Sequence, residues 1–169
     1  MSAASILETR QLAWPDEAAC AATASRVATH PALADAFIEL HGPLGAGKTT
    51  FARHLLHALG VCGAIKSPTY ALLEPYRAGA AAGAFAIAHF DFYRFDDPQE
   101  WEDAGFRDIF AAEGLKLIEW PAKAGTLLPL PDLRLRITPL DETRREVYIQ
   151  AFTPLGITLL EPQVSGAST

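Results

Sequence analysis

Lysine is scarce in this 169-residue chain, and the scarcity limits what the chain can bind. The 20 acidic residues outnumber the 14 basic ones, the net charge is −6, and the longest basic run is Arg144-Arg145. A protein that neutralises many phosphates of a nucleic acid usually presents a dense basic face. We therefore expect no direct binding of RNA or DNA, so that any contact with a nucleic acid comes through a partner protein.

Cysteine is also scarce, and long apolar runs are missing. Cys20 and Cys62 have no close-spaced partner, so we expect neither a zinc site nor a disulfide framework, only buried or free thiols. Residues 1–10 contain Glu8 and no long apolar stretch, which argues against a secretory signal. The longest uncharged run, 78–90, is too short to span a bilayer. A cytoplasmic location is expected.

What the sequence does have is enough apolar residues, 50% of the chain, for one substantial core. We expect a single domain over 1–160 and a frayed tail over 161–169. Period-2 and period-3.6 patterns alternate: strands are expected at 9–13, 34–41, 64–76, 85–95, 115–120, 133–138 and 146–152, and helices at 14–29, 48–59 and 97–110. The pattern predicts a three-layer α/β domain with a mixed, mostly parallel central sheet and an antiparallel hairpin. The Ala/Gly-rich segment 78–84 is expected to be a hairpin connection or a small insertion.

One motif carries specific chemistry. The stretch Gly42-Pro43-Leu44-Gly45-Ala46-Gly47-Lys48-Thr49 fits G-x-x-x-x-G-K-[ST] and lies between an expected strand and an expected helix, as in a P-loop NTPase. The glycines let backbone N–H groups converge on a phosphate, and the helix directs its positive end at the same point. Lys48 can bridge β and γ oxygens, Thr49 can ligate Mg²⁺, and Thr50 is a further phosphate contact. The loop predicts binding of a nucleoside triphosphate with Mg²⁺, and ATP is favoured because the guanine-reading N-K-x-D motif is absent.

A phosphate loop usually works with an acid at the end of a neighbouring strand. Asp91 and Glu119 each end an apolar run, so either can be the acid on the metal side, and helix capping or pairing with Arg is the alternative for each. Thr69, shortly after the loop's helix, is a candidate sensor of the γ-phosphate, with an ordinary turn at Pro68 as its alternative. His89 is expected to be structural. Arg94 is expected to pair with Asp96 or Asp97, with contact to the nucleotide or to a partner as its alternative.

Several segments in this order resemble the TsaE (YjeE) family, the ATPase of bacterial tRNA threonylcarbamoyladenosine biosynthesis. They are Trp14-Pro15-Asp16-Glu17, the glycine loop with Thr50, Lys66-Ser67-Pro68-Thr69-Tyr70, His89-Phe90-Asp91-Phe92-Tyr93-Arg94 and Glu119-Trp120-Pro121. The glycine loop alone identifies only a nucleotide site, whereas the later segments together are specific.

The resemblance implies roles for individual residues. It implies that residues 45–50 hold the phosphates, that Thr49 binds Mg²⁺, and that Asp91 and Glu119 act at the metal and at the attacking water. It further implies that Thr69 is a switch residue, that Glu17 contacts the base or ribose, and that Trp120 lies close to the nucleotide.

The same resemblance implies partners of the TsaB and TsaD type, which transfer a threonylcarbamoyl group to adenosine 37 of tRNAs reading A-starting codons. In that setting the chain hydrolyses ATP and does not make the new bond itself. Two alternatives remain from the residues alone: a small-molecule kinase with the same loop, although no arginine-rich lid segment is evident, and an ATP-gated binding module in which hydrolysis is incidental.

Overall fold

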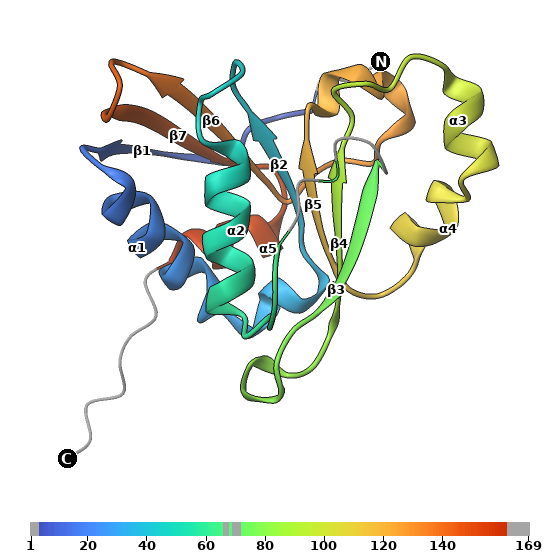
Figure 1. Ribbon diagram of the computed structural model, residues 1–169, viewed down its shortest axis with the longest axis horizontal. Helices are drawn as coiled ribbons and strands as arrows, with labels where there is room; N and C mark the ends of the chain where they lie inside the picture. Colours follow the sequence, from blue (N-terminus) through green and yellow to red (C-terminus); the bar gives the residue numbers. More distant parts are fainter. Residues whose placement is uncertain (1–3, 66–67, 69–71, 162–169) are drawn as a thin grey trace.

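A seven-stranded mixed sheet forms the centre of the computed structural model, which describes residues 4–65, 68 and 72–161 (Figure 1). The strand order is β1-β7-β6-β2-β5-β4-β3. The strands are β1 (Glu8–Trp14), β2 (Phe37–His41), β3 (Leu73–Arg77), β4 (Ala86–Asp91), β5 (Leu115–Glu119), β6 (Leu133–Pro139) and β7 (Arg145–Ala151). β6, β2, β5 and β4 run parallel to their neighbours within this group, while β1, β7 and β3 pair antiparallel at the two sides. The expected α/β class and mixed sheet are confirmed.

Helices cover both faces of the sheet (Figure 1). They are α1 (Glu17–Ala28), α2 (Lys48–Ala58), α3 (Pro98–Asp103), α4 (Phe106–Ala111) and α5 (Pro154–Leu160), with 3₁₀ turns η1 (Pro31–Asp35), η2 (Ala80–Ala82), η3 (Pro121–Lys123) and η4 (Gly125–Leu127). α1 and α2 lie side by side, and α3 and α4 lie on the other side of the sheet (Figure 1). None of the helices in the described ranges is long and apolar enough to cross a membrane.

The central strands are apolar on both faces because each face has its own helical cover. In β5, Leu115 and Leu117 pack in the cluster that includes α1 and α2, whereas Ile118 packs in the cluster under α3 and α4. Side chains alternate between faces along a strand, so one short apolar run supplies both clusters. Burying each such side chain stabilises the fold by about 1.5–3 kcal/mol.

The cluster under α3 and α4 is mostly aromatic. Phe90 of β4 contacts Phe106 edge-on with ring centroids 5.2 Å apart and stacks on Phe110 at 5.0 Å. Trp101 stacks on Phe110 at 5.2 Å and is 3% exposed. Ring pairs at these separations stabilise a fold beyond the area they bury, so this cluster fixes the end of β4 where Asp91 lies.

Several element boundaries differ from those expected. The strand expected over 34–41 begins only at Phe37, because Pro31–Asp35 forms a 3₁₀ turn. The helix expected over 97–110 is two short helices, broken at Gly105, whose φ of 68° lies in the left-handed region. Helix α5 was not expected. A strand was expected over 64–76, and within the described residues it corresponds to β3, Leu73–Arg77. β3 pairs antiparallel with β4, and η2 lies in the connection between them.

Candidate nucleotide-binding site

The loop of residues 42–47 connects the end of β2 to the start of α2, as expected from the motif (Figure 1). Gly47 precedes the helix with φ 110°, a conformation that favours glycine. A Cβ on Gly42 would lie 2.6 Å from the Ile137 carbonyl oxygen of β6, so the loop passes too close to the sheet for any other residue. Because α2 begins at Lys48, the helix N-terminus opens directly onto the loop.

A cavity of about 370 Å³ lies beside this loop. The residues that line it come from the loop and α2, from the ends of β4 and β5, and from the start of β7: Leu44, Gly45, Ala46, Gly47, Lys48, Thr49, Thr50, Asp91, Tyr93, Arg94, Glu119, Trp120 and Arg145. The carboxyl ends of parallel strands are where ligands bind in open α/β sheets. The structure thus brings the expected residues 45–50, both expected acids and Trp120 to one cavity.

The two acids are neighbours across the sheet. Asp91 ends β4, Glu119 ends β5, and the two residues are paired in the parallel register. Both are buried, at 5% and 2% exposed. Thr49 Oγ1 donates a hydrogen bond of 2.7 Å to Glu119 Oε1, and Asp91 Oδ1 accepts one of 3.0 Å from the Tyr93 N–H. Glu119 is therefore in direct contact with the hydroxyl of the motif, whereas Asp91 is fixed by the backbone that follows β4.

His89 holds the other oxygen of Glu119. Its Nε2 lies 2.8 Å from Glu119 Oε2, and its side chain is fully buried. A carboxylate only accepts hydrogen bonds, so Nε2 carries the proton and donates it. Within the part of the chain that the structure describes, Nδ1 has no hydrogen-bond partner. The expectation that His89 is only structural is therefore incomplete, because its side chain orients an acid of the cavity.

Lys48 is drawn into the loop. Its ammonium group donates to the carbonyl oxygens of Gly42 and, at 3.0 Å, of Pro43, and lies 4.0 Å from the centroid of the Trp120 ring. Burial lowers the pKa of Lys48, an effect opposed by the Glu119 and Asp91 carboxylates. Trp120 has φ 57°, in the left-handed region that residues other than glycine rarely adopt. The Tyr93 ring packs on it with centroids 5.0 Å apart.

Oxygen ligands suit Mg²⁺, and the cavity supplies them from Thr49, Asp91 and Glu119. Among the described residues there is no cluster of three or more His, Cys, Asp or Glu that could hold an ion unaided. Two carboxylates and a hydroxyl leave several ligand positions open to phosphate oxygens and water. The donor set fits a magnesium ion that arrives with a nucleotide better than a permanent metal site.

Three expected site residues are not among those that line the cavity. Gly42 is one, since the lining of the loop begins at Leu44. Glu17 begins α1 and contacts His54 Nε2 of α2 at 2.9 Å, with its side chain 68% exposed, and it is not among the residues lining the cavity. Its contact with a base or ribose stays a prediction. Thr69 lies outside the described residues, so its role as a switch also stays a prediction.

Arg145 and Tyr93 line the cavity although sequence reasoning assigned neither to the site, and Arg145 makes the more extensive contacts with the loop. Its Nε donates to the Ala46 carbonyl oxygen at 2.9 Å across 99 positions of sequence. A basic pair at a hairpin carries no local signal of such a long-range contact. Arg94 also lines the cavity, where its alternative role as a nucleotide contact stays a prediction.

Comparisons with known proteins agree on one family. The family profile described as "Threonylcarbamoyl adenosine biosynthesis protein TsaE" matches residues 14–147. The tRNA threonylcarbamoyladenosine biosynthesis protein TsaE of Haemophilus influenzae is 42% identical over 123 residues, 73% of this chain and 75% of that one. The protein of the same name from Bacillus subtilis is 34% identical over 119 residues, 70% of each chain.

A solved structure supports the same conclusion. The crystal structure of Bacillus subtilis YdiB superposes with a TM-score of 0.69 at 26% identity and covers 90% of this chain and 93% of YdiB. The fold is that of a P-loop NTPase, as the loop and sheet order indicate. From the profile, the relatives and the fold together, the chain belongs to the TsaE family.

Proposed function

We propose that this chain is a Mg²⁺-dependent ATPase subunit needed to form threonylcarbamoyladenosine at position 37 of tRNAs reading A-starting codons. In this proposal it acts in the cytoplasm with partners of the TsaB and TsaD type and does not perform the transfer itself. The names of its relatives support the pathway. The observation that carries the enzymatic part is the Thr49–Glu119–His89 chain of hydrogen bonds. Thr49 and Glu119 line the cavity together with Lys48, and His89 holds Glu119 from the interior.

In this proposal, the position of each residue in the cavity determines its role in ATP hydrolysis. The N–H groups at the start of α2 and the Lys48 ammonium neutralise phosphate oxygens, for which Lys48 exchanges its bonds to the Gly42 and Pro43 carbonyls. Bound Mg²⁺ supplies charge neutralisation of the β and γ phosphates. We assign Glu119 to the metal side because it touches the Thr49 hydroxyl. Asp91, which neighbours it across the sheet, is assigned to orienting the attacking water.

An acidic chain is consistent with this division. The net charge of −6 favours indirect contact with tRNA through partner proteins over direct binding. A cycle of ATP binding and hydrolysis then acts on the partner complex, and the tRNA is bound by the partner proteins.

Trp120 lies 4.0 Å from the Lys48 ammonium group. The environment of its ring therefore changes when Lys48 moves onto a phosphate.

The test is ATP hydrolysis measured with the chain alone, with the two partner proteins, and with the partners and tRNA. We expect slow hydrolysis alone, a clear rise with the partners, and tRNA modification that stops with Lys48→Ala. A rate that does not respond to cognate partners would contradict the proposal. If Asp91→Asn abolishes turnover and tRNA modification still proceeds, the chain is an ATP-gated binding module, and hydrolysis is not its function.

A further inference from the structure

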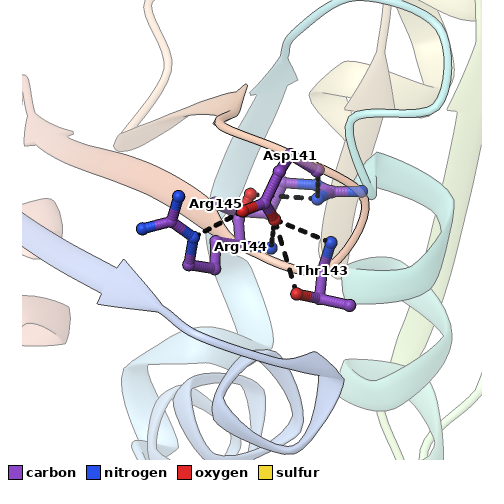
Figure 2. Close-up of polar contacts among 4 residues, drawn as sticks. All are labelled: Asp141, Thr143, Arg144 and Arg145. Atoms are coloured by element: carbon purple, nitrogen blue, oxygen red, sulfur yellow. Dashed lines mark hydrogen bonds and ion pairs between the residues drawn. The ribbon is translucent and has the colours of Figure 1, made fainter.

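The turn between β6 and β7 is built around Asp141. Its carboxylate accepts hydrogen bonds from the N–H groups of Thr143 at 3.0 Å and Arg144 at 2.8 Å, and from Arg144 Nε at 2.6 Å (Figure 2). The Leu140 N–H donates to the Arg144 carbonyl oxygen at 2.9 Å and closes the turn. The turn is exposed, yet its backbone is fixed by one carboxylate. It therefore presents the next residue, Arg145, in a defined direction.

The Arg145 guanidinium connects this turn to the phosphate loop. On the turn side, Nη1 donates to the carbonyl oxygens of Asp141 at 2.9 Å and Arg144 at 3.0 Å (Figure 2). On the loop side, Nε donates to Ala46 O at 2.9 Å and Nη2 to Gly45 O at 3.3 Å. One planar cation thus bonds four carbonyl oxygens from two segments about 100 residues apart.

These bonds fix the direction of two loop peptides. The Gly45–Ala46 peptide is held at both ends, because its oxygen accepts from Arg145 and its N–H donates to Pro43 O at 3.1 Å. In the trans Ala46–Gly47 peptide the N–H points opposite to the oxygen, so holding that oxygen turns the Gly47 N–H away from Arg145. A loop that binds phosphate through N–H groups depends on such peptide directions.

We propose that Arg145 is a positioning residue that presets the phosphate loop for nucleotide and links its shape to the β6–β7 turn. The inference rests on the proposed nucleotide binding. Arg145 acts through the loop carbonyls and is not itself a phosphate ligand. The planar guanidinium group of Arg145 is essential for this role, since a lysine ammonium cannot direct donors to four separated oxygens at once.

The neighbouring residue provides a matched control. Arg144 carries the same charge, but its side chain bonds Asp141 at the surface and is 60% exposed. Arg144→Ala removes one positive charge and one side-chain bond to Asp141 from the same turn. The backbone N–H bonds of Thr143 and Arg144 to Asp141 do not depend on that side chain, so the Arg145 contacts with the loop are expected to stay. Arg145→Lys keeps the positive charge and removes the planar guanidinium donors. It therefore distinguishes the effect of hydrogen-bond geometry on nucleotide affinity from the effect of charge.

The experiment measures Kd for Mg²⁺-ATP and Mg²⁺-ADP together with the nucleotide-free melting temperature of each variant. We expect Arg145→Ala and Arg145→Lys each to raise both Kd values by about tenfold or more, the scale for lost bonds from a charged donor. Arg144→Ala should stay within about twofold, as an exposed pair contributes little. If Arg145→Ala does not fold, Arg145→Lys decides the outcome.

Three results would overturn the inference. Unchanged Kd with a lowered melting temperature would make Arg145 a structural residue only. A loss for ATP without a loss for ADP would make it a ligand of the γ-phosphate. An unchanged Kd in Arg145→Lys would mean that charge alone matters. Failure of the unsubstituted chain to bind either nucleotide would instead refute the proposed function, so the two failures are distinguishable.

Discussion

His89 Nε2 and Glu119 Oε2 are 2.8 Å apart in the interior of the sheet, on adjacent strands β4 and β5. With Thr49 on its other oxygen, the Glu119 carboxylate is held at both ends. A buried carboxylate fixed in this way does not need to reorganise when ligands arrive, which is the condition for preorganised electrostatic stabilisation.

Replacing His89 with Phe should lower the rate of ATP hydrolysis more than it lowers affinity for ATP. Loss of a hydrogen bond to a charged group costs about 1.5–3 kcal/mol, or about 10- to 100-fold in kcat if Glu119 then turns away from the metal side. The measurement is kcat with partners present, alongside Kd for Mg²⁺-ATP. His30→Gln, at a buried histidine before η1, is the control and should keep kcat. An equal kcat in His89→Phe would remove His89 from the site.

The two acids should respond differently to magnesium. Glu119→Gln is expected to bind ATP, fail in turnover, and need about tenfold more Mg²⁺ for half-maximal residual activity, since Glu119 touches Thr49. Asp91→Asn should lose turnover with an ordinary Mg²⁺ requirement. Titrating Mg²⁺ at saturating ATP checks both variants, and a reversed pattern would exchange the roles assigned to the acids. Thr49→Ala should likewise raise the Mg²⁺ concentration needed, as Glu119→Gln does.

Strand and loop signals were local, and so they could be predicted. The glycine loop lies between an apolar strand and a periodic helix, and Asp91 and Glu119 each end an apolar run. Each of these patterns can be recognised within a short segment of the sequence. Helix α5 has only seven residues and depends on its Thr153 cap, which accepts from the Gly156 N–H at 3.1 Å, and on burial of Leu159. A helix this short forms through tertiary packing, which periodicity does not report.

Contacts across the sheet explain what was missed in the site. A histidine in a strand is usually packed, so the sequence predicts a structural role for His89. Its pairing with Glu119 depends on the parallel register of β4 and β5. Arg145 reaches Ala46 only because β7 follows β6 in the sheet and β6 pairs with β2. Register and strand order are products of the whole fold, so neither residue carried a local signal.

The two cysteines should differ in reactivity. Cys20 is buried, so its thiol is inaccessible to reagents. Burial, and then the Glu17 carboxylate, raises the pKa of Cys20 to about 12, so the thiol also stays protonated. Cys62 is exposed. A thiol reagent at mildly alkaline pH should modify Cys62 alone in the folded chain and both residues in denaturant. Cys62→Ser should abolish the reaction of the folded chain, and rapid labelling of that variant would contradict the buried position of Cys20.

The Asp141 turn should stabilise the chain in a pH-dependent way. The backbone N–H of Arg144, then its side chain, holds the pKa of Asp141 well below its ordinary value of 3.8. Because the folded carboxyl has the lower pKa, its stabilisation is complete above the unfolded value and is lost as pH falls below it. Asp141→Asn should therefore lower the melting temperature near neutral pH, and the difference from the unsubstituted chain should shrink below about pH 4. Glu142→Gln, an exposed acid on the same turn, is the control and should show no such convergence. A difference that stays constant down to low pH would mean that Asp141 acts through shape alone and that its charge does not hold the turn that presents Arg145.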